Sequence, residues 1–147
     1  MAFIRCESGG GGAVVATATL WTNTSPSNDF AAQTITLNDS IQNFDLIEIH
    51  FKATKAAGSP EGSVVYHVSD IVKYKGEQIT SSNDCLYMVL GGRVSAGYWC
   101  SRPILYVDDT SFNVRTCGRL GNPGVAQPDN VTSALIPVSI TGIKYSS

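Results

Sequence analysis

The sequence predicts an all-β fold, an antiparallel, jelly-roll-like β-sandwich of about eight strands. Apolar and polar residues alternate with a period of two along several short segments, which is typical of half-buried strands. Clusters of Pro, Gly, Asn, Asp and Ser separate these segments at regular intervals. No stretch combines a sustained 3.6-residue apolar period with helix caps. The 147 residues are enough for one domain with its own core.

Four strands are expected in the N-terminal half, at residues 13–21, 30–37, 45–54 and 63–74. The third alternates most clearly, with apolar side chains on one face and polar ones on the other: Ile47, Ile49 and Phe51 against Glu48, His50 and Lys52. The fourth alternates in the same way, with Val64, Tyr66, Val68 and Val72 on its apolar face. These patterns predict strands that each bury one face.

The C-terminal half supplies the remaining strands. Residues 85–90 form a fully apolar strand that Gly91 and Gly92 should end, and residues 98–107 form another. Pro103 breaks that second strand and belongs at a sheet edge or a bulge. Residues 111–117 follow a turn, residues 118–129 form an irregular crossing, and residues 134–144 form the last strand. Its apolar face is expected to hold Ile136, Val138 and Ile140.

Composition and charge exclude several classes of protein. Ten basic and twelve acidic residues give a net charge of −2, and charged residues make up only 15% of the chain. Such a balance has no general attraction for nucleic acid or anionic lipid. No apolar run approaches the roughly 20 residues of a membrane helix, and the start of the chain is too short and polar for a signal peptide. We therefore expect neither a nucleic-acid partner nor membrane insertion.

The chain divides into a short leader and one domain. Residues 1–12 end in four glycines, which give a flexible tether. Phe3 and Ile4 are apolar, and with Cys6 they are the candidates for attachment or for contact with a neighbouring subunit. Residues 13–147 form the predicted β-sandwich domain.

The four cysteines do not predict a metal site. Cys6, Cys85, Cys100 and Cys117 include no C-x-x-C pair, and both histidines are distant from them in sequence. The last three are expected to be small buried residues on strands. A disulfide formed after release into an oxidising medium is the alternative, so whether the four are thiols or disulfides stays open.

Catalytic groups are not predicted, and neither is a cofactor. The chain has no G-x-S-x-G elbow, and His50 and His67 lie within strands, opposite their apolar neighbours. Asp108 and Asp109 are the one adjacent acidic pair considered, but neighbouring strand residues point to opposite faces. A turn is therefore expected there, with weak calcium binding as the alternative.

Aromatic residues near Gly97 suggest a binding surface. Exposed Tyr and Trp side chains favour recognition of sugar or protein, whereas buried ones would simply belong to the core. The candidate binding residues are Tyr98, Trp99, Tyr106, Asp108 and Asp109.

Three segments of the chain carry a family resemblance. They are LWTNTSPSNDFAAQTITL at residues 20–37, DLIEI at residues 45–49 and IPVSITGIK at residues 136–144. Together they resemble recurring segments of phage and prophage virion proteins, notably the terminal domains of tail fibres and other host-facing appendages. Residues from about 55 to 129 match nothing in that pattern. Trp21 and Phe30 flank a polar turn and can pack on each other, while Gly142 allows a bend in the last strand.

The resemblance implies a non-enzymatic structural protein of the bacteriophage virion. It implies a tail-fibre or receptor-binding module, assembled in the host bacterial cytoplasm as a symmetric homo-oligomer, with a trimer favoured. Expected partners are copies of itself, other virion proteins and a glycan or protein of the host surface. A capsid decoration protein or head fibre is the nearest alternative. A stand-alone carbohydrate-binding module and a small hydrolase acting on envelope polysaccharide are alternatives of other classes.

Overall fold

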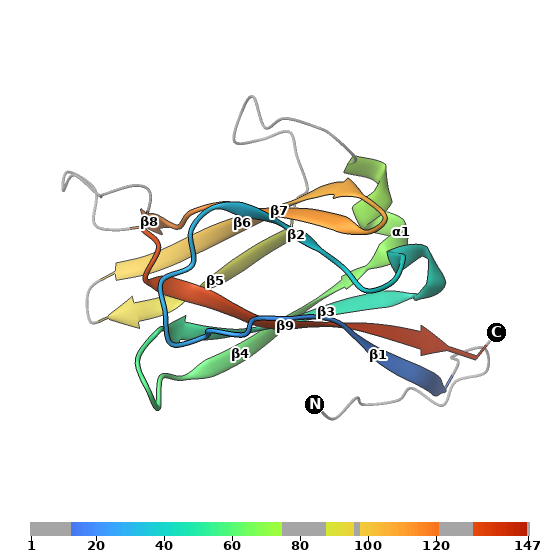
Figure 1. Ribbon diagram of the computed structural model, residues 1–147, viewed down its shortest axis with the longest axis horizontal. Coiled ribbons are helices and arrows are strands. Elements are labelled where there is room, and N and C mark those ends of the chain that lie inside the picture. The colour runs from blue at the N-terminus through green and yellow to red at the C-terminus, as the bar shows by residue number, and fades with distance from the viewer. Residues whose placement is uncertain (1–12, 75–87, 96–97, 121–130, 147) are drawn as a thin grey trace.

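The computed structural model describes residues 13–74, 88–95, 98–120 and 131–146. Two antiparallel sheets face each other and enclose the core (Figure 1). The predicted all-β sandwich is confirmed, with nine strands in the described part of the chain. No helix in that part is long and apolar enough to cross a membrane.

The first sheet has four strands in the order β1-β9-β3-β4. They are β1 (Val14–Thr22), β9 (Ala134–Tyr145), β3 (Leu46–Thr54) and β4 (Glu61–His67). β1, β9 and β3 begin and end close to the residues that alternation predicts, whereas β4 ends earlier. The first and last strands of the chain pair with each other, so the two segments that bracket the family resemblance lie side by side.

The second sheet has the order β2-β7-β6-β5, and β8 pairs with β6 beyond the end of β7. Its strands are β2 (Gln33–Thr36), β7 (Ser111–Val114), β6 (Tyr98–Asp108), β5 (Met88–Ser95) and β8 (Gly118–Leu120). The long strand β6 is central, because β5 lies along one of its edges and β7 and β8 along the other.

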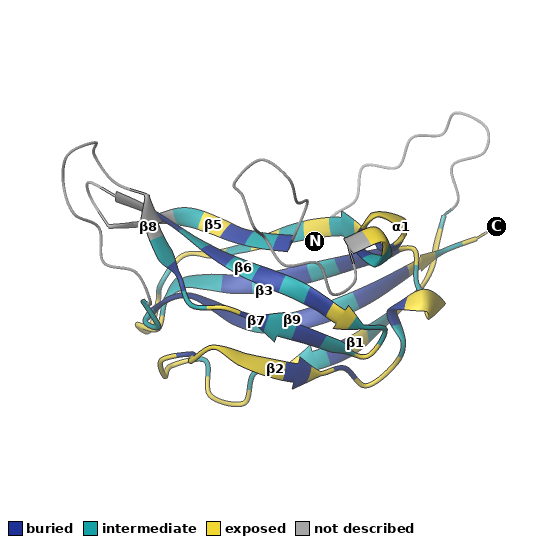
Figure 2. Cartoon of the chain, turned by 90° about the horizontal axis from the view of Figure 1, so that it is seen from above, coloured by how far each residue is buried: buried dark blue, intermediate teal, exposed yellow. Residues whose placement is uncertain are grey.

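The core lies between the two sheets, where buried residues run along the inward faces of the strands (Figure 2). The face of β3 predicted to be apolar is buried as expected. Side chains at most 1% exposed come from both sheets: Leu20, Ile47, Ile49, Leu90, Ile104, Phe112, Val114, Ile136 and Ile140. Val138 is only half-buried, because the register of β9 shifts at that point against β3.

Residues 63–74 are not one strand, which corrects the prediction. β4 ends at His67, and the helix α1 (Val68–Ile71) and the 3-10 turn η2 (Val72–Tyr74) follow. The backbone N–H of Val68 donates to the carbonyl of Asp45 at 3.0 Å, which turns the chain. Val68 and Ile71 are both buried. A spacing of three or four residues suits a helical turn, and this spacing was hidden in a pattern that also fits a period of two.

Gly91 and Gly92 do not end their strand, which is a second correction. Both lie inside β5 and pair with Ser101 and Cys100 of β6, and β5 continues to Ser95. Strand ladders need only backbone groups, so glycine can continue one at some entropic cost. A Cβ on Gly92 would lie 3.5 Å from the Leu135 side chain, an ordinary contact distance. Residues 85–87 of the predicted strand lie outside the described residues.

Pro103 lies inside the central strand β6 and does not break it. Its carbonyl accepts a hydrogen bond from the N–H of Arg115 at 2.9 Å. Arg115 falls between the end of β7 and the start of β8, where the ladder along that edge of β6 is interrupted. Proline has no N–H to return the reciprocal bond to the Arg115 carbonyl, and Arg102 Nη1 donates to that carbonyl instead, at 2.8 Å.

Candidate interaction surfaces

The five residues predicted to bind do not form one cluster. Tyr98 and Trp99 begin β6, whereas Tyr106 and Asp108 lie at its other end. A strand rises about 3.4 Å per residue, so the two groups are roughly 25 Å apart. The side chains of Tyr98 and Trp99 fall outside the described part, and so do Phe3, Ile4, Cys6 and the whole predicted leader.

Tyr106 belongs to the core and not to a surface. It is 7% exposed, and its ring meets Phe112 edge to face with centroids 6.5 Å apart. Its hydroxyl donates to the carboxylate of Asp109. Burial, and then the bond to Asp109, raise the pKa of Tyr106 to about 12. Tyr106 is therefore a core residue, which corrects its prediction as a binding residue.

Asp108 and Asp109 hold a turn, as predicted for them. Asp108 Oδ1 accepts from the backbone N–H of Thr110 at 2.9 Å and from its hydroxyl at 3.2 Å. The backbone carbonyl of Asp109 accepts from the N–H of Ile41 at 2.9 Å. These bonds fix the β6–β7 hairpin and tie it to a neighbouring loop. The described residues contain no group of three side chains placed to hold a metal ion.

One polar row on the outward face of the first sheet has the residue types of a catalytic triad. His50 Nδ1 lies 3.2 Å from Ser63 Oγ, and His50 Nε2 lies 3.5 Å from Glu61 Oε1. Acyl transfer also needs N–H donors aimed at the developing oxyanion. β3 pairs with a strand on each side, so its backbone N–H groups are engaged in the sheet. Exposed His67 lies apart from this row, at the end of β4.

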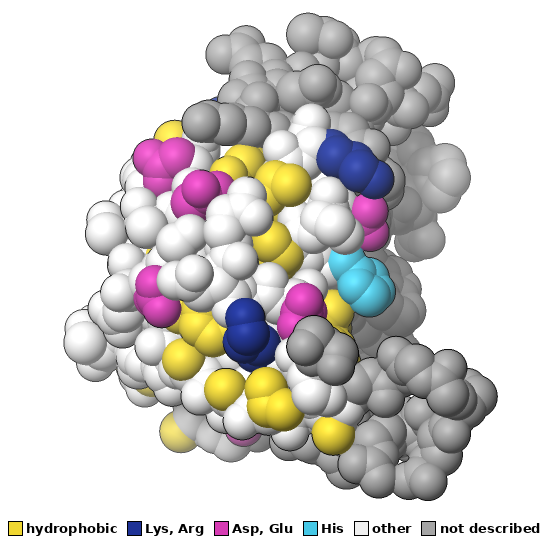
Figure 3. Space-filling model, turned by 90° about the vertical axis from the view of Figure 1, so that its right-hand side faces the viewer, with side chains coloured by type: hydrophobic (Ala, Val, Ile, Leu, Met, Phe, Trp, Pro, Cys, Tyr) yellow, Lys and Arg dark blue, Asp and Glu magenta, His cyan; other side chains and the backbone are white. Residues whose placement is uncertain are grey.

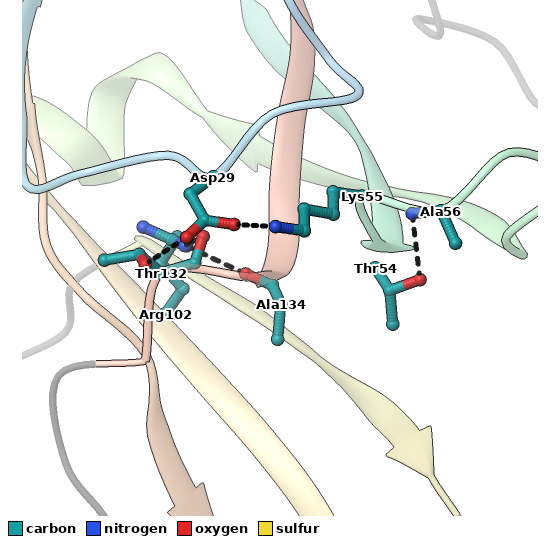
Figure 4. Close-up of polar contacts among 7 residues, drawn as sticks. All are labelled: Asp29, Thr54, Lys55, Ala56, Arg102, Thr132 and Ala134. Atoms are coloured by element: carbon teal, nitrogen blue, oxygen red, sulfur yellow. Dashed lines mark hydrogen bonds and ion pairs between the residues drawn. The ribbon is translucent and has the colours of Figure 1, made fainter.

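Sequence reasoning missed Arg102, which is completely buried. Its guanidinium donates to four backbone carbonyls, of which Figure 4 includes those of Thr132 and Ala134. Nη1 reaches Phe30 at 3.0 Å and Arg115 at 2.8 Å. Nη2 reaches Thr132 at 3.2 Å and Ala134 at 2.9 Å, and Nε reaches Ala134 at 3.3 Å. All five N–H groups of the side chain can be satisfied by these bonds.

Arg102 therefore connects β6 with the segment before β2, the end of β7 and the start of β9. Its guanidinium also lies over the ring of Phe30, 5.7 Å from the centroid. Trp21 meets the same ring edge to face at 5.9 Å, so the packing predicted for Trp21 and Phe30 is confirmed. Desolvation lowers the pKa of Arg102. The strand alternation of β6 could have predicted that Arg102 is buried. Cys100 and Ile104 lie two residues to either side of it and share its inward face.

Ala134 is a second meeting point of this network. Its carbonyl also accepts from the Cys117 thiol at 3.0 Å. The next residue, Leu135, has a φ of 49°, a left-handed conformation that non-glycine residues adopt only at a cost. Burial raises the pKa of Cys117 to about 11. Cys100 and Cys117 are both buried, as predicted, and no disulfide joins them, whereas Cys85 lies outside the described residues.

A surface ion pair lies beside Arg102 (Figure 4). Lys55 Nζ is 2.6 Å from Asp29 Oδ1, and the Thr132 hydroxyl donates to Asp29 Oδ2 at 3.1 Å. The bond to Lys55, followed by the bond to Thr132, lowers the pKa of Asp29. These exposed contacts join Asp29 to Lys55 and Thr132. Arg102 binds the carbonyls of Phe30 and Thr132 in the same two segments as Asp29 and Thr132, on the buried side.

Among the described strands, β1 has a partner on one side only, and its other edge, called the open edge here, is a candidate interaction surface. β1 ends the first sheet, and its exposed residues include Val14 and Val15, at 41% and 57%. Asn38 covers the far end of this edge, donating from its backbone to the Leu20 carbonyl at 2.7 Å. β1 and the end of β9 project beyond the sandwich in Figure 1. Figure 3 shows that end of the molecule, where hydrophobic areas are separated by mostly uncharged atoms.

The described residues thus define a β-sandwich held by a buried arginine, with β1 at one edge of the first sheet. Comparisons with models of known protein families and with curated proteins found no match.

Proposed function

We propose that the chain is a non-enzymatic structural module of a bacteriophage virion, placed in a host-facing tail fibre or receptor-binding appendage. One observation carries the proposal. The segment that resembles phage appendage proteins, residues 20–37, spans the end of β1, a loop and β2, and its aromatic residues Trp21 and Phe30 pack on each other. The backbone carbonyl of Phe30 also accepts a hydrogen bond from Arg102. The residues of the resemblance therefore serve the fold, as expected for a structural building block.

The same proposal includes a symmetric homo-oligomer in the virion, assembled in the host cytoplasm beside other virion proteins. A chain with only 15% charged residues supports self-association, since uncharged polar surface costs less to desolvate than charged surface. The trimer implied by the resemblance remains a prediction. A glycan or protein of the host surface is the proposed outer partner.

Mass spectrometry and cryo-electron microscopy of purified particles test the proposal. Particles released from cells that encode the chain should contain it, in density at the tail tip or along a fibre. Density on the capsid lattice would contradict the tail-fibre or receptor-binding role and support the decoration-protein or head-fibre alternative. If no particle contains the chain, the proposal is lost.

Binding to the host is tested separately. A glycan array probed with the purified protein, beside Trp99→Ala, would support the carbohydrate-binding alternative if a signal disappears in the variant while the fold persists. Adsorption of particles blocked by antibodies against the chain is the result expected for a receptor-binding module.

A further inference from the structure

We propose that the open edge of β1 pairs antiparallel with β1 of a second copy, about a two-fold axis. The inference rests on the homo-oligomer of the proposed function and names a contact for it, a two-fold contact that makes a dimer in place of the trimer implied by the resemblance. The first sheets of two copies would then join into one continuous sheet, in the order β9-β1-β1-β9 at the contact.

The geometry of the first sheet leaves the start of β1 poorly supported. Leu46 of β3 pairs with Ile143 of β9, and Ile143 pairs with Thr17 of β1. β3 begins at Leu46, so residues 14–16 of β1 extend past it with only β9 beside them. A two-stranded ribbon is marginal in water on its own. Two further strands from a second copy would make it four-stranded.

The covered part of the edge fixes the register of the contact. The backbone N–H of Asn38 donates to the carbonyl of Leu20, and its side chain donates to the carbonyl of Thr19 at 3.3 Å. The run that Asn38 leaves uncovered is therefore residues 14–18, which include a register shift against β9 between Val14 and Ala16, and a symmetric antiparallel contact over this run is centred on Ala16. Val14 then lies opposite Ala18 of the second copy, and Val15 lies opposite Thr17.

The lack of charged residues on β1 favours a second copy as the occupant of this edge. No charged residue occurs between Glu7 and Asp29, so two copies of β1 meet without like-charge repulsion. Natural sheets protect exposed edges with charged side chains, and β1 has none, whereas the opposite edge strand β4 carries Glu61 and His67. Lys144 and its copy would be three strand spacings apart, about 14 Å, which exceeds the Debye length in physiological salt.

Molecular mass in solution tests the contact. Sedimentation equilibrium should give twice the mass of one chain for the wild type. Val15→Lys, which puts a charge on the open edge, should weaken the dimer at least about tenfold. Val65→Lys is the matched control, since Val65 is a valine of β4 with 40% exposure, and it should leave the dimer unchanged. Circular dichroism and a urea midpoint establish that both variants are folded.

A cysteine at the axis gives a second measurement that needs no loss of function. Ala16→Cys places two thiols opposite each other, so mild oxidation should trap a covalent dimer. Val65→Cys should not form one. Failure to trap the dimer while the wild type is dimeric would overturn the register centred on Ala16.

The outcomes separate this inference from the proposed function. A monomeric or three-fold wild type, or a dimer that resists Val15→Lys, overturns the β1 contact even if virions contain the chain. A dimer that depends on β1 supports the contact even if no particle contains the chain, in which case only the proposed function fails.

Discussion

Arg102 is a charge removed from water, and no described carboxylate pairs with it. The described ion pairs involve His50, Lys55 and Lys73. The carbonyl oxygens around Arg102 compensate its charge through charge-assisted hydrogen bonds, which are stronger than neutral ones. The carbonyls depend on Arg102 in turn, because a buried acceptor without a donor is destabilising. This mutual dependence makes Arg102 the residue whose loss should cost the fold most.

We predict that Arg102→Met lowers the free energy of unfolding by at least about 3 kcal/mol, since it strands several buried carbonyls. Arg102→Lys should lose less, because an ammonium keeps the charge and three donors. Urea denaturation followed by tryptophan fluorescence measures both. Arg115→Met is the matched control, as its side chain is exposed, and should change stability by no more than about 0.5 kcal/mol. An Arg102→Met protein as stable as this control would contradict the assignment.

Gly142 is required by the ring of Phe44. A Cβ on Gly142 would lie 2.6 Å from Phe44 Cγ, closer than atoms approach in real contacts. Gly142→Ala should therefore destabilise the protein by about 1–3 kcal/mol, measured by thermal or urea unfolding. Gly91→Ala is the comparison, because its nearest neighbour would be a backbone oxygen at 4.0 Å. It should be close to neutral.

A double variant makes the Gly142 prediction specific. Phe44→Leu in the Gly142→Ala background should recover part of the lost stability, because it removes the ring that clashes. Additive losses from the two changes would show that the ring is not the cause.

The sequence could predict some of these residues and not others. Trp21 and Phe30 were expected to pack because they flank one turn, and they do. Arg102 could not be predicted from its residue type, since arginine is almost never fully buried unless it is paired. Only its place in the alternation of β6, on the same face as Cys100 and Ile104, indicates that it is buried.

At the scale of elements, the β6–β7 hairpin shows how turn chemistry places strands. Asp108 pairs with Ser111, and the register shifts between Tyr106 and Asp108, where Val107 is left exposed. Among described non-glycine residues only Leu135 has a positive φ. The turn is therefore not of the type that matches strand twist unaided, and a bulge beside it adjusts the twist.

We predict that Asp108→Ala destabilises the protein by about 1 kcal/mol, because the N–H of Thr110 loses its acceptor. Asp108→Asn keeps an acceptor oxygen and should lose less than half of that. Urea midpoints under identical conditions measure both changes. An alanine variant without loss of stability would mean that the aspartate does not hold the turn, and would reopen a binding role for it.

Element prediction succeeded where one period dominated. β3 and β9 were found because their segments alternate over many residues. α1 was missed, since Val68 and Val72 fit a period of two and a helical turn equally well. The predicted strand stops short of the end of β5, because glycine often marks the end of a strand, although the ladder uses only backbone groups.

For the whole molecule, sequence patterns predicted two layers but not which strand joins which sheet. Pairing of β1 with β9 and of β3 with β9 joins segments far apart in the chain, and local periodicity contains no information on such partners. The contacts of the buried Arg102 also join segments that are far apart in the chain. Arg102 draws together segments from three places in the chain, so opening the sandwich should expose the whole network at once.

Cys117 reports that opening. It is 1% exposed, and burial raises the pKa of its thiol from 9.0 to about 11. The thiolate is the reactive form, so native Cys117 should alkylate far more slowly than in the unfolded chain. We predict strong protection from iodoacetamide at pH 8, measured peptide by peptide by mass spectrometry, and a faster reaction in Arg102→Met. Equal rates in native protein and in urea would contradict a closed sandwich.

The same thiol gives a pH dependence of stability. The unfolded chain loses the Cys117 proton near pH 9, whereas the folded chain holds it until about pH 11. The contribution of the neutral thiol is therefore complete below pH 9 and is lost as the pH rises from 9 to 11. Urea midpoints should fall over that interval, and Cys117→Ala should show a shallower fall than the wild type. Parallel curves for the two proteins would remove Cys117 as a cause of alkaline unfolding.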